Sequence, residues 1–181
     1  MKMIFTILLI AVFTTAFTQT PILPIDSTTN LITYSAVVEA KGTKDELFSR
    51  AREWFAKTYN SAQSVIQMED KDKIIGKALT QVYRKVAIGT YEYGYVNYTI
   101  SIYFKDDKYK YEVTNLYHTG QSIEDGRIPD FGPCEEMMNE KKKHLQKIYY
   151  NLLIQADINI KALISGLKKD MSTATVAKDS F

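Results

Sequence analysis

The chain has 181 residues, of which 45% are hydrophobic, and a formal net charge of +2 at pH 7. A charge this close to neutral lacks the basic excess with which proteins hold the nucleic-acid backbone, so nucleic acid is excluded as the expected partner. The single cysteine, Cys134, excludes an internal disulfide, and the fold must therefore rest on its hydrophobic core.

Residues 1–18 have the pattern of a secretory signal peptide. Lys2 precedes the apolar run Ile4–Phe13, and a small-residue cleavage site ends at Thr18. The apolar run is shorter than the roughly 18–20 residues that a spanning helix needs, which argues against the alternative of an uncleaved anchor. We expect an exported protein, periplasmic or secreted, with no transmembrane segment after signal removal.

The next segments predict a lead-in, a strand and a helix. Residues 19–30 contain two prolines and a polar cluster, which indicates an extended lead-in. Residues 31–40 alternate as a strand does. The sequence Thr43-Lys-Asp-Glu46 is a capping box that begins a helix expected to run to about Tyr59. Trp54 lies on the apolar stripe of this helix and is expected to anchor it to a sheet.

Two further strands are predicted at residues 64–69 and 74–86, with a bulge at Gly76. The clearest strand signal follows at residues 95–104, where core-type and polar residues alternate with a period of two. Residues 108–117 form the second strand of a hairpin whose turn is Asp106-Asp107.

A change of alternation precedes the hairpin. Tyr91, Tyr93 and Tyr95 share one parity, whereas the core residues from Val96 onward have the other, which predicts a bulge at Gly94. Two alternatives follow for the three tyrosines: the core face of the preceding strand, or the open face.

The last part of the chain is helical. Residues 121–133 are rich in glycine and proline and predict a loop. Residues 134–171 place apolar residues at helical spacing, either in one long helix or in two with a kink near Asp157. Residues 172–181 are expected to be a disordered tail.

This order of elements predicts an α+β fold: an antiparallel sheet with helices packed on one face, plus a long C-terminal helical extension. Antiparallel neighbours joined by short turns, with the helices set apart, are typical of that class. Because both helices are amphipathic, both are expected to cover the same face of the sheet and to leave the other face open.

Several strand patterns carry a family resemblance: Pro24-x-Asp26, Ile32-x-Tyr34, Ile75-Gly76-Lys77, residues 94–102 and residues 109–115. They resemble a domain-of-unknown-function family, number 4468, which is described as having a TATA-binding-protein-like fold and occurs in exported proteins of Bacteroidota-type bacteria. The resemblance covers residues 31–120, with residues 134–171 as an extension. It implies a fold and no catalytic residue. The fold name suggests DNA, but fold does not imply function, and the export signal and near-neutral charge argue against it.

The chemistry-bearing residues are few. Neither His118 nor His144 has a partner at metal-ligand spacing, so no metal and no cofactor are expected. Cys134 with either histidine could form a nucleophile–base pair, since a thiol at a helix N-terminus has a lowered pKa. No third orienting group accompanies them, which favours a half-buried structural thiol and no enzymatic activity.

Tyrosine is the remaining signal. Eight of these residues crowd one sheet: Tyr91, Tyr93, Tyr95, Tyr98, Tyr103, Tyr109, Tyr111 and Tyr117. Packing in strands explains such enrichment by itself. The sharper hypothesis is that Tyr91, Tyr93, Tyr95 and above all Tyr103 line the open face and bind a glycan, a peptide or an envelope protein.

The sequence therefore predicts a non-enzymatic binding or envelope-assembly module. The alternatives are a periplasmic hydrolase that uses Cys134 and a structural protein that pairs through its C-terminal helix.

Overall fold

The computed structural model describes residues 22–87, 89–123 and 126–172. The predicted signal peptide and the tail beyond Ser172 lie outside these ranges. In chain order the elements are β1 (Tyr34–Glu39), α1 (Lys44–Thr58), α2 (Ala62–Val65), β2 (Ile66–Asp70), β3 (Lys73–Val86), β4 (Gly89–Lys105), β5 (Lys108–Thr119), β6 (Ser122–Ile123), β7 (Gly126–Arg127), β8 (Gly132–Pro133), α3 (Cys134–Met138) and α4 (Lys143–Ser172).

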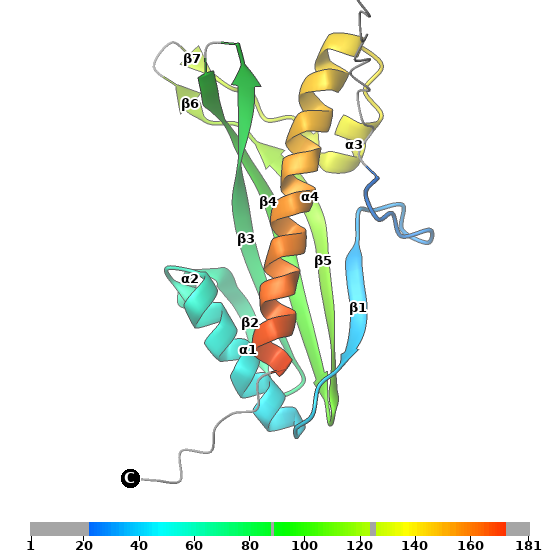
Figure 1. Ribbon diagram of the computed structural model, residues 1–181, viewed down its shortest axis with the longest axis vertical. Helices are drawn as coiled ribbons and strands as arrows, with labels where there is room; N and C mark the ends of the chain where they lie inside the picture. The colour runs from blue at the N-terminus through cyan, green and yellow to red at the C-terminus, as the bar shows by residue number, and fades with distance from the viewer. Residues whose placement is uncertain (1–21, 88, 124–125, 173–181) are drawn as a thin grey trace, which may run out of the picture.

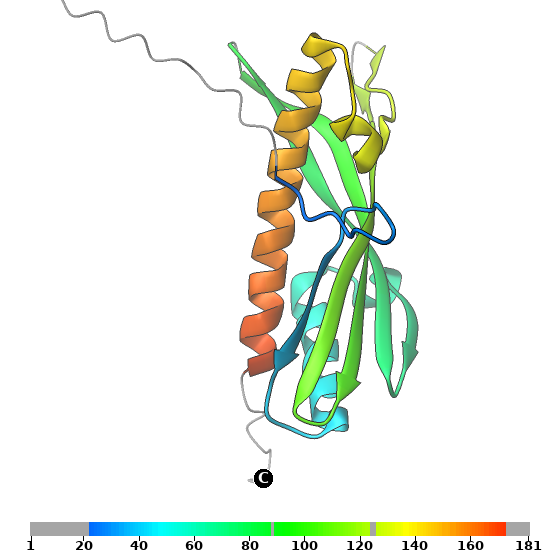
Figure 2. The same cartoon turned by 90° about the vertical axis from the view of Figure 1, so that its right-hand side faces the viewer.

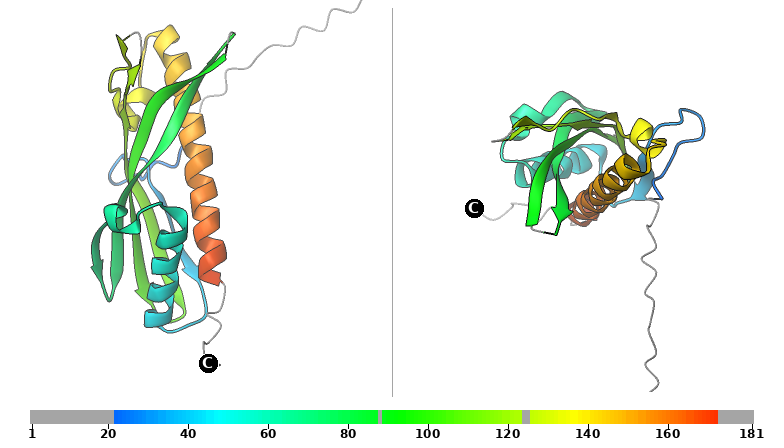
Figure 3. Two further views of the ribbon diagram at one scale, coloured as in Figure 1. Left: turned by 90° about the vertical axis from the view of Figure 1, so that its left-hand side faces the viewer. Right: turned by 90° about the horizontal axis from the view of Figure 1, so that it is seen from above.

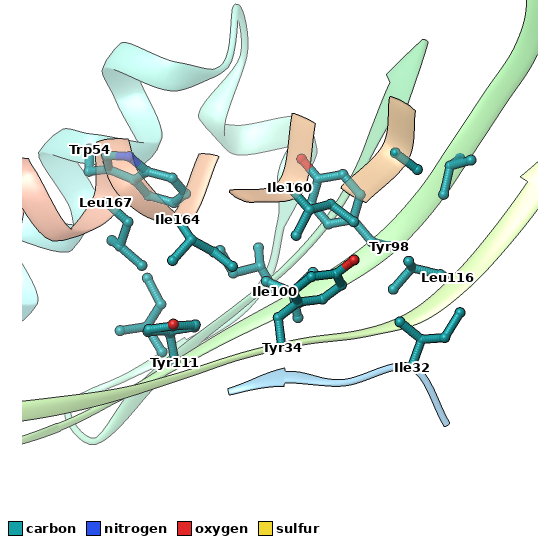
Figure 4. Close-up of a cluster of buried hydrophobic side chains, with 14 of the residues drawn as sticks. Ile32, Tyr34, Trp54, Tyr98, Ile100, Tyr111, Leu116, Ile160, Ile164 and Leu167 are labelled. Carbon is teal, nitrogen blue, oxygen red and sulfur yellow. The ribbon is translucent and has the colours of Figure 1, made fainter. Parts of the chain in front are cut away.

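Six strands form the main antiparallel sheet, in the order β1-β5-β4-β3-β2 with the short β8 paired to the end of β5, and β6 and β7 form a separate two-stranded sheet. Helices α1 and α4 lie against the same face of this sheet, and α4 runs along most of the length of the molecule (Figures 1 and 2). The predicted α+β fold, with helices on one face and a long C-terminal helix, is confirmed. Between them the helices and the sheet bury a single apolar core (Figure 4).

The predicted hairpin is the centre of the sheet. Strands β4 and β5 pair from Lys105↔Lys108 outward across the Asp106-Asp107 turn. Alternate residues of β4 are buried as the period of two predicts: Val96, Tyr98, Ile100, Ile102 and Phe104. One face of the strand therefore forms the core, and the other is free to form a site.

Helix α1 begins at the predicted capping box. The Glu46 backbone N–H donates to Oγ1 of Thr43 at 3.3 Å, and the Thr43 N–H donates to Oε2 of Glu46 at 2.8 Å. Trp54 is only 2% exposed and lies beside Ile164 and Leu167 of α4 (Figure 4). The single tryptophan is thus the core anchor that its helical spacing indicated.

Two bulges reverse the alternation of the central strands. The predicted bulge at Gly94 is confirmed by a register shift between Gln81 and Tyr83 of the partner strand, and Gly94 has φ +104°. A second bulge lies in β5 at Asn115, which has φ +56°, and was not predicted. The bulge adds one residue to β5 and so reverses which residues face the core. Odd-numbered Val113 is therefore buried before the bulge, and even-numbered His118 is buried after it.

The bulge predicted at Gly76 is wrong in its position. The register shift lies in the neighbouring strand β2, between Ile66 and Met68. Gly76 instead serves packing, because a Cβ at this position would lie 2.9 Å from the ring of Phe55. The strand predicted at residues 64–69 begins two residues later than predicted, at Ile66, because the residues up to Val65 form α2.

The expected extended lead-in folds back on itself. Oδ1 of Asp26 accepts hydrogen bonds from the backbone of Thr28 and Thr29, and Ile25 forms a bridge with Ile32. This Asx turn brings the segment against the start of β1.

The predicted C-terminal helix is two helices, but the break is not near Asp157. Helix α3 ends at Met138, and α4 begins at Lys143 and continues unbroken through Asp157 to Ser172. The buried residues of α4 repeat at helical spacing: Leu152, Leu153, Ala156, Ile160, Ile164, Leu167 and Met171. In the part of the chain that the structure describes, no helix is both long and apolar enough to cross a membrane.

Candidate binding groove

A groove of about 860 Å³ lies beside β3. Helix α2, which lies next to β3 in Figures 1 and 3, forms one side with the end of α1. Lys77, Ala78 and Leu79 of β3 also line the groove. Successive side chains of a strand point to opposite faces, so the groove reaches both faces of the sheet. It can do so because β3 has a free edge here.

That edge is free because β2 is shorter than β3. The pairing of β2 with β3 ends at Ile66↔Gly76, and beyond this point β4 is the only strand neighbour of β3 among the described residues. Further along β3, the side chain of Gln155 in α4 pairs with the outward backbone groups of Tyr83. Its Oε1 accepts from the Tyr83 N–H at 2.9 Å, and its Nε2 donates to the Tyr83 carbonyl at 2.6 Å.

Between these two covered positions, Leu79 and Gln81 present their backbone outward. Tyr83 points its N–H and C=O away from β4, and alternate residues of a strand point the same way. Among the residues that the structure describes, no hydrogen bond reaches the outward groups of Leu79 or Gln81. The short stretch of unpaired strand edge therefore begins in the groove, at Leu79, and continues along β3 to Gln81.

The floor of the groove is polar and almost uncharged. It consists of residues from β4 and β5: Asn97, Thr99, Asn115, Tyr117 and Thr119. Asn97 Nδ2 donates to Oγ1 of Thr119 at 2.9 Å and to the Tyr117 carbonyl at 3.2 Å, which fixes its amide. Lys77 is the one charged side chain among the described residues that line the groove. Such a surface suits a neutral ligand that hydrogen-bonds.

Two tyrosines close the groove at its α1 side. The hydroxyls of Tyr59 and Tyr98 lie 3.3 Å apart. Burial raises the pKa of both phenols, so both remain protonated at neutral pH. This wall therefore adds hydroxyl groups and no charge.

The four predicted binding tyrosines do not line this groove. Tyr103 and Tyr95 are half-buried on the open face, with Tyr103 at the far end beside the Lys44–Asp72 ion pair. Tyr91 is 50% exposed, close to the start of β4.

Tyr93 lies on the helix side, within an aromatic cluster. Its ring is 6.0 Å from Phe131, which in turn lies 4.8 Å from Tyr149 of α4. The bulge at Gly94 explains why Tyr93 and Tyr95 occupy different faces despite their shared parity. Neither alternative therefore holds for all three tyrosines, since Tyr93 lies on the helix side and Tyr95 on the open face.

Sequence reasoning missed Tyr117 and Asn115 as groove residues. Tyr117 is 42% exposed because the bulge at Asn115 turns it to the open face. Asparagine is one of the few residues that adopt a left-handed conformation readily, and Asn115 within a strand pattern was the available signal. Leu79 was a second indication in the sequence, because it is an apolar residue at a strand position whose neighbours two residues away face solvent. In the structure its side chain is 53% exposed.

Cys134 is not an activated thiol. It is fully buried, and burial, followed by the charge of Glu135, raises its pKa to about 12, which is the opposite of the predicted lowering. The helix-terminus effect is weak because α3 has only five residues. The thiol therefore packs in the core.

His118 also has a structural role. It is fully buried, with Nε2 2.9 Å from the Tyr93 carbonyl and Nδ1 accepting from the Phe131 N–H at 3.3 Å. Burial lowers its pKa. No group of three metal-ligating side chains occurs among the described residues.

Comparisons with known proteins agree with this fold. Residues 34–119 match the family model described as "Domain of unknown function (DUF4468) with TBP-like fold". A DUF4468 family protein from Bacteroides ovatus is similar at 15% identity and a TM-score of 0.56, over 79% of this chain and 90% of that chain.

A TBP-like protein from Parabacteroides distasonis is similar at 13% identity and a TM-score of 0.54, over 76% of this chain and 93% of that one. No curated protein matches. At these identities the solved structures establish the fold alone. The family model thus assigns residues 34–119 to DUF4468, and the solved structures show that the chain has a TBP-like fold.

Proposed function

We propose that this protein is an exported, non-enzymatic binding module whose groove takes an extended peptide segment of a partner protein. In this proposal the peptide pairs with β3 as an added strand, a recognised mode of peptide recognition. The unpaired backbone of Leu79, which lines the groove, and of Gln81, the next outward-facing residue along the same edge, is the observation that carries it.

The free edge favours a peptide over a glycan. Leu79 and Gln81 offer N–H donors and C=O acceptors at the spacing of a strand, and a second strand supplies the complementary groups at the same spacing. A glycan has hydroxyl groups but no such repeat. The exposed side chains of Leu79 and Tyr117 would then contact alternate side chains of the added strand.

The shortness of the edge also supports a specific role. Natural proteins cover sheet edges because an open edge invites unwanted pairing. Here β2 covers one part of β3, and Gln155 satisfies Tyr83. Between these two covered positions the open edge begins at Leu79 in the groove and is short, which favours pairing with a short segment.

The alternative of pairing through the C-terminal helix has less support. The apolar face of α4 is used within its own molecule, against the sheet and α1. Among its described large apolar residues, Ile158 is the one that is strongly exposed, at 59%. The predicted signal peptide supports a partner in the cell envelope, as does the resemblance to a family that occurs in exported bacterial proteins.

The test begins with a displayed library of random seven-residue peptides selected against the purified chain. Enriched peptides are then titrated against three variants: Leu79→Pro, Leu79→Ala and Tyr103→Phe. Proline removes the outward N–H without a loss to the β4 ladder, whereas alanine keeps it. We expect Leu79→Pro to abolish binding, Leu79→Ala to weaken it and Tyr103→Phe to leave it unchanged.

Selection of no peptide above background contradicts the proposal. Equal binding by Leu79→Pro and the unmodified chain contradicts it as well, provided that circular dichroism shows the variant to be folded. N-methylation of alternate peptide amides gives a second check that needs no protein variant, since it removes the donors that strand pairing requires.

A further inference from the structure

A second, smaller cleft of about 370 Å³ lies between the end of β3 and the first turns of α4. Figures 1 and 3 show these two segments side by side, away from α2. Arg84 and Lys85 reach this cleft from β3, and His144 and Lys147 reach it from α4. The cationic side chains of Arg84, Lys85 and Lys147 thus gather in one place from segments about 60 positions apart in the sequence.

These cations are not neutralised by the protein. Among the residues that the structure describes, none of Arg84, Lys85 and Lys147 forms an ion pair. Glu92, which lies opposite Tyr83 in the sheet, accepts a hydrogen bond from Gln121 and does not line the cleft. The positive end of the α4 dipole adds to the potential here.

The two walls of the cleft are held together. Gln155 bonds to both backbone groups of Tyr83, and Asn159 donates to Oγ1 of Thr80 at 2.7 Å. These contacts tie α4 to β3 just beyond the cleft, so the cations cannot separate freely to relieve their repulsion.

Arg84 is also ordered. Its guanidinium lies 5.5 Å from the centre of the Tyr93 ring, and Nη1 is 3.4 Å from the Tyr93 hydroxyl. Because these contacts position the guanidinium, it is preorganised to donate hydrogen bonds to an oxyanion.

The floor of the same cleft is apolar. Ile148 is half-buried and supplies the accessible apolar surface of the cleft, and the fully buried Leu152 also lines it. A free inorganic anion would contact only the cationic side chains of the cleft and would leave its apolar surface without a partner. The combination fits a ligand with an anionic head and an apolar body.

We propose that this cleft binds a phosphate ester with an apolar body, with the phosphate between Arg84, Lys85 and Lys147. The anionic headgroup and first methylenes of a phospholipid have this chemistry, and so does a small soluble organic phosphate. The site is independent of the peptide groove, because the two share no lining residue.

The experiment measures binding of three probes to the purified chain by calorimetry: short-chain phosphatidic acid below its micelle concentration, inorganic phosphate, and vesicles of phosphatidylcholine with or without phosphatidylglycerol. The test variant is Lys85→Gln with Lys147→Gln. The matched control is Lys105→Gln with Lys108→Gln, which removes the same charge at the far end of the sheet.

We expect short-chain phosphatidic acid to bind at least tenfold more tightly than inorganic phosphate. The Lys85 and Lys147 variant should weaken this binding at least tenfold, and the control less than twofold. Added binding to vesicles that contain phosphatidylglycerol identifies a lipid as the source, and binding of the soluble probe alone identifies a small organic phosphate.

The proposal is overturned if the chain binds none of the probes, or if the two charge-matched variants weaken binding equally. It is also overturned if inorganic phosphate binds as well as phosphatidic acid, since the apolar floor would then have no role. Circular dichroism of both variants, with unchanged spectra, excludes a loss of fold as the cause.

Discussion

The Tyr34 hydroxyl donates a 2.8 Å hydrogen bond to Oδ1 of Asp157, joining the edge strand β1 to the middle of α4. Oδ2 of the same carboxylate accepts from Lys161 at 2.7 Å. Figure 4 shows Tyr34 among the apolar side chains that face α4. Burial, followed by the bond to Asp157, raises the pKa of Tyr34, so the phenol remains a donor at any physiological pH. The contact holds the long helix across the sheet that positions both proposed sites.

Replacing Tyr34 by phenylalanine should lower the free energy of unfolding by about 2 kcal/mol, because a hydrogen bond to a charged group is lost inside the core. Urea denaturation of the variant measures this change. Tyr103→Phe is the matched control, since Tyr103 is half-buried on the open face, and should change the stability little. A Tyr34→Phe variant as stable as the unmodified chain would contradict the structural role of this contact.

The same substitution at Tyr109 should have the opposite sign. Tyr109 is 1% exposed, and its hydroxyl has no hydrogen-bond partner among the described residues. Burial raises its pKa to about 12, so the hydroxyl is neutral but unsatisfied. Removing an unsatisfied buried polar group should stabilise the fold by about 1 kcal/mol. A destabilised Tyr109→Phe variant would mean that the hydroxyl is satisfied in solution.

Stability should fall in mild acid because of His118. Its pKa is lowered in the folded chain by burial, against an unfolded value near 6.5. The folded state therefore favours the neutral ring, and its contribution is complete above about pH 6.5 and is lost as the pH falls toward the folded pKa. Protonation of Nδ1 would also break the bond from the Phe131 N–H.

The check compares the unfolding free energy at two pH values, about 7.5 and about 5.5, on either side of the unfolded pKa. The drop should be smaller in His118→Gln than in the unmodified chain, whereas His144→Gln, with its exposed side chain, should keep it. An identical drop in all three proteins would show that other groups cause the pH dependence.

The bulge glycine should tolerate no side chain. Gly94 has φ +104°, and a Cβ there would lie 2.2 Å from the Thr119 carbonyl. Gly94→Ala combines backbone strain with a clash and should cost about 3 kcal/mol or more. Gly132 has φ +82° but nothing within 4 Å of a Cβ, so Gly132→Ala should cost only about 1 kcal/mol. Thermal unfolding of both variants separates the clash from the strain, and equal losses would contradict the close approach at Gly94.

The sequence predicted the parts of the fold that local pattern determines. The capping box at Thr43, the alternation from Val96 to Phe104 and the parity change at Gly94 all have short-range causes, and all three appear in the structure. The position of Gly76 has a long-range cause, the ring of Phe55, which no local pattern contains.

The groove was not predictable for the same reason. It depends on where β2 stops along β3 and on Gln155 reaching Tyr83 from a helix 72 residues away. A count of tyrosines suggested the open face but could not select Tyr117 over Tyr103, because that choice follows from the bulge at Asn115. Asn115 is the one residue whose identity could have indicated this bulge, since asparagine adopts a positive φ readily.

The most direct test of the proposed function is backbone amide hydrogen exchange, measured by NMR with and without a selected peptide. The account predicts that the amides of Leu79 and Gln81 exchange rapidly in the free chain and become protected in the complex, and that Leu79→Pro removes the protection at Gln81. Binding that leaves both amides unprotected, or that protects residues around Tyr103 instead, would contradict strand addition at β3.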